Sequence, residues 1–101
     1  MAMMPEAKVK AQIKKFLVER GAWYCTPATG GFGRSGVPDF LVCWQGQFIG
    51  IEAKAPGSLR NTTTMQDREL VGIRAAGGAA IVCCDVAPLK ALFDIIAPQS
   101  Y

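Results

Sequence analysis

Two acidic residues and a lysine stand in the middle of the chain, on apolar segments of strand-like composition. Asp39 follows Val37-Pro38, Glu52 comes thirteen residues later, and Lys54 stands two positions beyond Glu52. Carboxylates that face each other across a hairpin repel and destabilise it. A divalent cation between them would reverse the sign of that interaction, so the pattern predicts a metal site.

The register of the expected hairpin decides whether the two acids face each other. Apolar segments on either side of Gln45-Gly46 have strand-like composition, and this dipeptide suits a two-residue hairpin turn. With the turn there, the numbers of paired residues sum to a constant, and Asp39 falls opposite Glu52. Side chains alternate along a strand, so Lys54 lies on the same face as Glu52.

The remaining segments predict one α/β domain over residues 1–101, in the order α-β-β-β-α-β-α. Helices are expected over residues 5–20, from 63 or 64 to about 76, and from about 85 to the residues before Pro98; strands are expected over residues 22–26, 40–44, 48–53 and 79–84. A helical crossover between the third and fourth strands predicts a mixed sheet flanked by helices.

The composition limits the class of protein. Half of the 101 residues are hydrophobic and 19% are charged, which argues against disorder. No apolar run approaches the roughly 20 residues of a membrane span, and the first residues lack the pattern of a signal peptide. A cytoplasmic protein is therefore expected. The net charge of +3 permits an anionic partner.

The chain has no histidine, which limits the chemistry available to it. A Ser-His-Asp triad and the common zinc hydrolase sites are excluded. The four cysteines form no Cys-x-x-Cys pair, so buried reduced thiols are expected rather than a zinc site or disulfides. Catalysis, if present, must use carboxylates, lysine and a hard metal ion.

Each acid also has a simpler interpretation. Asp39 after a proline is typical of a turn, and Glu52 could form an ion pair with Lys54. Glu6 could complement the dipole of the first helix, although its helical direction lies among those of three apolar residues, Val9, Ile13 and Leu17. That direction points toward the core and would allow Glu6 to act as a further metal ligand.

Gln66 and several basic residues are further candidates. Gln66 either forms a capping box with Thr63 or faces the sheet from the second helix. Arg34, in a glycine-rich loop five residues before Asp39, is expected beside the site, where it could bind a phosphate. The other candidate DNA contacts are Lys10 and Lys14 on the first helix, whose lysines otherwise form a solvated face, and Arg60.

The succession Pro38-Asp39, then Glu52-Ala53-Lys54, resembles the PD-(D/E)xK nuclease superfamily and, more narrowly, its virus-type replication-repair nuclease (VRR-NUC) domain. The resemblance spans roughly Glu6 to Cys84, and a core of this kind resembles the stand-alone phage or bacterial members. This resemblance implies the cytoplasm of a bacterium or of a phage-infected host cell. It implies a restriction-endonuclease-like core and a phosphodiesterase that uses Mg²⁺ or Mn²⁺.

The resemblance also implies roles for individual residues. Asp39, Glu52 and the backbone carbonyl of Ala53 would bind the metal, and Glu6 would match the helical acid. Lys54 would position or polarise the attacking water, and Gln66 would match the family's helical glutamine.

The first hypothesis is a homodimeric endonuclease for branched DNA such as Holliday junctions, since symmetric resolution needs two active sites related by a two-fold axis. Exposed apolar residues such as Trp23 and Phe32, or those of the last helix, could form the interface. One alternative is a non-catalytic nucleic-acid-binding or assembly module that keeps the fold. Another is a nuclease for flaps or linear duplex DNA.

Overall fold

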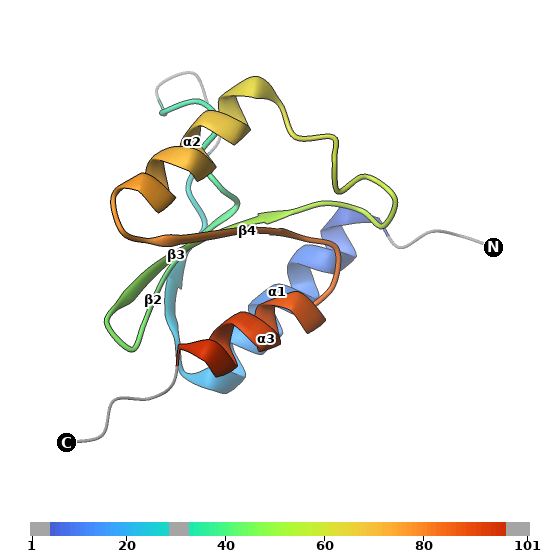
Figure 1. Ribbon diagram of the computed structural model, residues 1–101. Coiled ribbons are helices and arrows are strands. Elements are labelled where there is room, and N and C mark those ends of the chain that lie inside the picture. Colours follow the sequence, from blue (N-terminus) through green and yellow to red (C-terminus); the bar gives the residue numbers. More distant parts are fainter. Residues whose placement is uncertain (1–4, 29–32, 97–101) are drawn as a thin grey trace.

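The computed structural model describes residues 5–28 and 33–96 and contains the predicted order of elements (Figure 1). The elements are α1 (Glu6–Arg20), β1 (Trp23–Cys25), β2 (Phe40–Trp44), β3 (Gln47–Ala53), α2 (Thr64–Ala75), β4 (Ala79–Cys83) and α3 (Ala87–Ile95). Phe32 lies outside the described residues. No described helix is long and apolar enough to cross a membrane.

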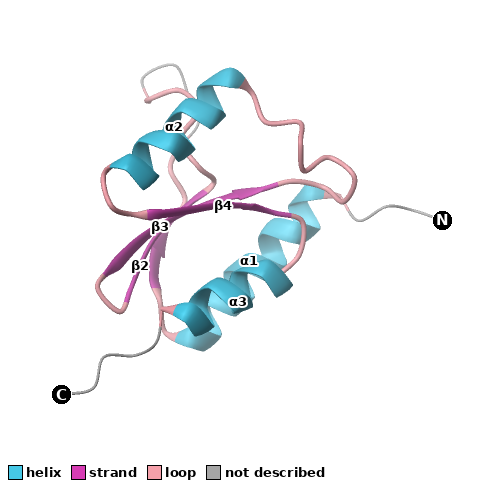
Figure 2. Ribbon diagram, viewed as in Figure 1, coloured by secondary structure: helices cyan, strands magenta, loops and turns pink. Residues whose placement is uncertain are grey.

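The four strands form one mixed sheet in the order β1-β2-β3-β4 (Figure 2). The first three strands pair antiparallel, whereas β4 runs parallel to β3. The connection through α2 makes this parallel pair possible, because parallel neighbours need a long crossover. The predicted mixed sheet is therefore confirmed.

The β2–β3 hairpin has the predicted register. Gln45 and Gly46 have φ angles of 51° and 76°, and two central residues with positive φ are typical of the type I′ turn. Trp44 pairs with Gln47 at the turn, and the pairing continues to the last pair of the ladder at the start of β2. Extension of this register by one step beyond the ladder sets Asp39 opposite Glu52.

The hydrophobic core lies between the sheet and the pair of helices α1 and α3, which cover the same face (Figure 1). Its buried members include Val9, Ile13 and Leu17 of α1, Leu89 and Phe93 of α3, and Val42, Ile49 and Ile51 of the sheet. The ring of Phe93 stacks on that of Trp44 with centroids 4.4 Å apart. This layer fixes α1, and with it Glu6 and Lys10, against the sheet.

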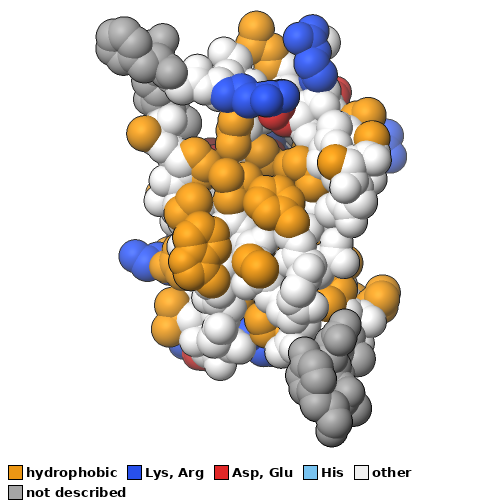
Figure 3. Space-filling model, turned by 90° about the vertical axis from the view of Figure 1, so that its left-hand side faces the viewer, with side chains coloured by type: hydrophobic (Ala, Val, Ile, Leu, Met, Phe, Trp, Pro, Cys, Tyr) orange, Lys and Arg blue, Asp and Glu red, His pale blue; other side chains and the backbone are white. Residues whose placement is uncertain are grey.

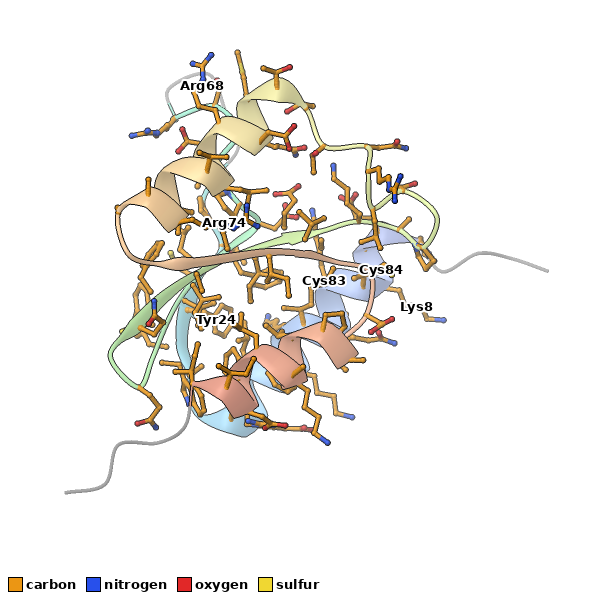
Figure 4. The ribbon with its side chains drawn as sticks, in the orientation of Figure 1. Lys8, Tyr24, Arg68, Arg74, Cys83 and Cys84 are labelled. Carbon is orange, nitrogen blue, oxygen red and sulfur yellow. The ribbon has the colours of Figure 1, made fainter. Side chains whose placement is uncertain are left out.

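Helix α2 covers the opposite face over β3 and β4. Arg74 reaches from α2 to the sheet, where its Nη2 donates to the carbonyl of Ala80 at 2.8 Å (Figure 4). The first turn of α2 lies over the end of β3, where Gln66 meets Glu52. The placement of this helix therefore determines the surroundings of Glu52.

The same face remains open over β1 and β2. Trp23 is opposite Cys43, and Cys43 is opposite Phe48, so the three form one exposed row across the strands. The side chains of Trp23 and Phe48 are 62% and 43% exposed. Hydrophobic side chains gather in the middle of the view in Figure 3. This row, residues 23, 43 and 48, is called the apolar row below.

All four cysteines are free thiols, as predicted, but their expected burial holds for only one. Cys83 is buried at the end of β4, Cys84 is half-buried, and Cys25 and Cys43 are exposed. The exposed pair lies on the open part of the sheet, which no described helix covers. The apolar composition of the strands therefore did not indicate which face of the sheet the helices would cover.

A short segment, residues 36–39, brings Asp39 to the sheet. Gly36 has φ +81°, and a Cβ atom there would lie 2.9 Å from the backbone nitrogen of Gln66. Pro38 is fully buried, and a Cβ atom on Gly50 would lie 3.0 Å from its Cγ. The segment is thus fixed between β3 and the start of α2, so two glycines permit the approach of Asp39 to Glu52.

We expect Gly36→Ala to lower the free energy of unfolding by about 2 kcal/mol, because the new Cβ meets both an unfavourable φ and the backbone of α2. Gly72→Ala is the matched control, since Gly72 is in the interior of α2 and a Cβ there meets nothing. It should raise stability by about 0.5–1 kcal/mol. Urea unfolding measures both. Equal stability of Gly36→Ala and the parent would contradict this account of the segment.

Candidate functional site

Asp39 uses its two carboxylate oxygens differently. Oδ2 accepts the backbone N–H of Ala53 at 2.8 Å, which holds the carboxylate against the end of β3. Oδ1 faces the ammonium of Lys10 at 3.4 Å. The side chain is 19% exposed, so Asp39 lies at the rim of the site with one oxygen fixed by the sheet and the other directed to α1.

Glu52 is the buried charge of the site. Its side chain is 5% exposed, and its Oε2 accepts from Gln66 Nε2 at 2.8 Å and lies 3.7 Å from Lys54 Nζ. Burial raises the pKa of Glu52 to about 7, and the nearby Asp39 carboxylate contributes to the same shift while Lys54 opposes it. Near neutral pH, Glu52 is therefore divided between its protonated and ionised forms.

Gln66 has both of the roles that the sequence left open. The side-chain Oε1 of Gln66 accepts a hydrogen bond from the backbone N–H of Thr63 at 2.9 Å. The backbone N–H of Gln66 donates to Thr63 Oγ1 at 3.1 Å, and the two bonds together form a capping box. The same Oε1 accepts from Lys54 Nζ at 3.2 Å, while Nε2 donates to Glu52. The side-chain amide of Gln66 thus connects the start of α2 with Glu52 in β3 and with Lys54 just after β3.

Glu6 occupies a more exposed position than the sequence indicated. It begins α1, its side chain is 45% exposed, and its Oε2 lies 3.4 Å from Lys10 Nζ. Val9 is the first buried residue of α1. Glu6 therefore lies outside the core, although it lies on the same side of the helix as the buried residues. Lys10 links Glu6 to Asp39 by ion pairs, and the charge of Glu6 also contributes to the raised pKa of Glu52.

Lys10 was predicted as a DNA contact, and the structure also makes it part of the site. It bridges Glu6 and Asp39, with 3.4 Å to each. Burial lowers its pKa, but Asp39 and then Glu6 outweigh that effect and hold the pKa above its ordinary value of 10.5. Its spacing of four residues from Glu6 was a sequence signal for the first ion pair; the second depends on the packing of α1.

The other predicted DNA contacts lie at different distances from the acids. Arg34 is not beside them: its Nε is 2.8 Å from Glu69 of α2, and the side chain is 77% exposed. The ion pair with Glu69 places the Arg34 side chain at α2. The separation of five residues between Arg34 and Asp39 in the sequence did not indicate this placement. Lys14 lines a hollow next to Asp39, and Arg60 is exposed in the loop between β3 and α2.

The carboxylates fit a cation that needs few protein ligands. Among the described residues, no group of three His, Cys, Asp or Glu side chains is arranged to hold a metal ion. Asp39 and Glu52 nevertheless supply two hard oxygen ligands, and the two carboxylates raise each other's electrostatic cost. Mg²⁺ keeps several waters and commonly takes one or two carboxylates together with substrate phosphate oxygens. The donor set therefore suits Mg²⁺ or Mn²⁺ better than a metal with a closed protein cage.

No family model matches the chain, and no curated protein or solved structure matches it either. What the side chains can do together is therefore inferred from their geometry. They place two acids, two lysines and one amide at one end of the sheet.

We expect stability without metal to fall as pH rises from about 5 to 8. The unfolded chain loses the Glu52 proton near 4.5, whereas the folded protein keeps it to about 7, so the folded state binds more protons between these values. The decrease should reach up to about 3 kcal/mol. Glu52→Gln should remove most of this dependence and be more stable than the parent at pH 8.

Urea unfolding at pH 5 and pH 8 in EDTA measures the effect. Asp94→Asn is the control, because Asp94 is an exposed acid that pairs with Arg20 outside the site. It should keep the pH dependence of the parent. An unchanged pH dependence in Glu52→Gln would show that the Glu52 carboxyl is not the group responsible.

Proposed function

We propose that the protein is a divalent-metal-dependent DNA endonuclease with a restriction-endonuclease-like core of the VRR-NUC type. One observation carries the proposal: Glu52 is a buried carboxylate with a raised pKa, positioned next to Asp39 and 3.7 Å from Lys54. Lys10 faces Asp39 and Lys54 faces Glu52, yet the pKa of Glu52 remains raised, so a further positive charge would stabilise the carboxylate pair. The resemblance of residues 38–54 to the nuclease motif supports the same interpretation.

Asp39, Glu52 and the backbone carbonyl of Ala53 would hold Mg²⁺ or Mn²⁺, and Glu6, which is paired with Lys10, is the further candidate ligand. When bound, such an ion polarises phosphoryl oxygens and lowers the pKa of water. The hydrogen bond from Ala53 N–H to Asp39 Oδ2 fixes one carboxylate before any ligand arrives. This preorganisation lowers the cost of assembling the site.

Lys54 is held in a defined position for a role in the reaction. Its side chain is 13% exposed, with Nζ at 3.2 Å from Gln66 Oε1 and 3.7 Å from Glu52 Oε2. A buried ammonium in that position can orient an attacking water and stabilise the negative charge that develops on a phosphate. Gln66 is a positioning residue, because it fixes both Lys54 and Glu52.

The substrate is proposed to be DNA, and branched DNA in particular. Lys14 lines the same hollow as Asp39 and Lys10, and Arg60 is exposed in the loop after β3, so both are basic groups that can contact phosphates. A domain of this size has little surface for contacts with base edges, so shape and backbone charge would dominate recognition.

Cleavage assays test the proposal. Purified protein is incubated with labelled junction, flap, duplex and single-stranded DNA in Mg²⁺, Mn²⁺ or EDTA. We expect cutting of branched substrates only with a metal, and Lys54→Met should lower the rate by about 10²- to 10⁴-fold. Lys90→Met is the matched control, since Lys90 is an exposed lysine of α3, and it should keep the parental rate.

The possible outcomes separate the candidate functions. Cutting in EDTA, or full activity of Lys54→Met, would contradict the proposed chemistry. Tight binding of a junction without cleavage in any metal would favour the non-catalytic module. Preferential cutting of flaps or linear duplex would keep the chemistry and change the substrate.

A homodimer is the proposed functional state, and the apolar row is its proposed interface. Trp23, on the part of the sheet that no described helix covers, and Phe48, at the border of the part under α2, expose large apolar surfaces, and such patches commonly mark interfaces. We expect Trp23→Glu to convert a dimer into a monomer in light scattering. Ile95→Glu is the control, because Ile95 is an 80% exposed residue of α3. Disruption by Ile95→Glu alone would place the interface on α3, and a monomeric parent would contradict the dimer.

A further inference from the structure

A hollow of about 310 Å³ borders the candidate site on the side of α1. It lies between α1, the residues that follow β1 and the segment that leads into β2. Lys10 and Lys14 of α1 and the carboxylate-bearing Asp39 contribute to its lining. Since Asp39 also belongs to the candidate site, the hollow and the proposed reaction centre share a wall.

The remainder of the lining is mainly apolar and includes Ala11, Pro27, Pro38 and Phe40. Pro38 and Phe40 are almost completely buried, so they close the bottom of the hollow. The apolar surface open to a ligand belongs to the exposed Ala11 and the half-buried Pro27 and Val37. Sites for single-stranded nucleic acid combine such apolar surfaces, which contact bases, with positive groups that contact the backbone. The hollow has both components.

The positive groups are arranged along one edge of the hollow. Lys10 and Lys14 are four residues apart on α1, and side chains at this spacing lie next to each other. Lys10 pairs with Glu6 and Asp39, whereas Lys14 is exposed and forms no ion pair within the described part of the chain. Lys14 is thus available to a phosphate, and Lys10 links that phosphate position to Asp39.

The size of the hollow limits what it can accept. At about 310 Å³ it stands at the lower end of ligand pockets, which span about 300–1,000 Å³. It can take one nucleotide but not a base pair. A nucleotide from a duplex would first have to leave the stack, at a cost of a few kcal/mol that is smallest for a base that is already unpaired.

A larger hollow of about 460 Å³ lies between α2 and the β2–β3 hairpin and does not share these properties. Its basic residue, Arg34, is paired with Glu69, and both line the same hollow. Neither Asp39 nor Glu52 contributes to its walls. The smaller hollow also contains a paired lysine, Lys10. It differs from the larger one in that it adds Lys14 and shares Asp39 with the candidate site, and these two differences favour it as the nucleotide site.

We propose that the smaller hollow holds one unpaired nucleotide of the DNA strand next to the phosphate that is cut. The base lies against Pro27 and Val37, and the phosphate lies at Lys14, next to Lys10. The location relative to the cut rests on the proposed function. The subsite would favour DNA with unpaired nucleotides near the cleavage position, as at branch points and flaps.

Two-dimensional NMR of ¹⁵N-labelled protein, titrated in EDTA with a tetranucleotide of thymidines, tests the subsite without any catalytic step. We expect the largest shifts at amides around the hollow, including those of Ala11, Lys14 and Thr26. Ala11→Leu fills the hollow without a change of charge, and Lys14→Glu reverses one charge of its rim. Each should weaken binding at least about five-fold, the lower range for the loss of one stacked base.

Two variants of α1 serve as matched controls. Gln12→Leu and Lys15→Glu make comparable changes at residues that line a different surface of the helix, and they should weaken binding less than their counterparts. An unchanged spectrum away from each substitution establishes that a variant is folded. Loss of folding in Ala11→Leu leaves Lys14→Glu to decide, because Lys14 is exposed.

Three results would overturn the subsite. They are shifts centred on Arg34 and Ile73 instead of the hollow, equal effects of the test and control variants, or binding of free thymidine monophosphate as tight as that of the tetranucleotide. The last result would indicate a free nucleotide as the ligand. DNA cleavage with normal binding by Ala11→Leu and Lys14→Glu would reject the subsite while leaving the endonuclease intact. Loss of binding in these variants of a protein that cuts no DNA would support the subsite and reject the endonuclease.

Discussion

The placement of Glu52 next to Asp39 is the interaction on which the rest of the site depends. Burial alone raises the free energy of an ionised Glu52, and a second carboxylate raises it further. The neighbouring groups offset this cost in distinct ways: Gln66 donates a hydrogen bond to Glu52, Lys54 brings a positive charge, and the Ala53 N–H holds Asp39. Even so, the pKa of Glu52 stays near 7, so the offset is incomplete without a bound cation.

Three separate parts of the fold converge to build this arrangement. The β2–β3 hairpin ends at Asp39 and Glu52, the first turn of α2 lies above them, and the first turns of α1 lie at their side. The start of α2 also carries the positive end of its dipole, which favours negative charge nearby. Because the capping box fixes Gln66 at that start, helix formation and the positioning of Glu52 are coupled.

The sequence predicted the features that depend on local rules. The turn at Gln45-Gly46 and the two-residue period of strands were sufficient for the hairpin register, and hence for the opposition of Asp39 and Glu52. The order of elements and the mixed sheet followed from the same kind of pattern. These predictions succeeded because each depends on residues close together in the chain.

The features that depend on packing between elements far apart in the chain could not be predicted from the sequence. The helical period gave the direction of Glu6 around α1. It did not indicate that the Glu6 side chain would be exposed and paired with Lys10. Arg34 forms an ion pair with Glu69 of α2 instead of lying beside Asp39. Gln66 was assigned two competing roles and has both, because one amide offers an acceptor and a donor in different directions.

The central claim is that Asp39 and Glu52 together bind a divalent cation. A crystal structure with Mn²⁺, examined by its anomalous scattering, tests it most directly. We expect an anomalous peak between the two carboxylates, at roughly 2.0–2.4 Å from an oxygen of each, and no such peak in Glu52→Gln. Mn²⁺ bound only elsewhere, or a site without Mn²⁺ at a concentration that supports cleavage, would contradict the account.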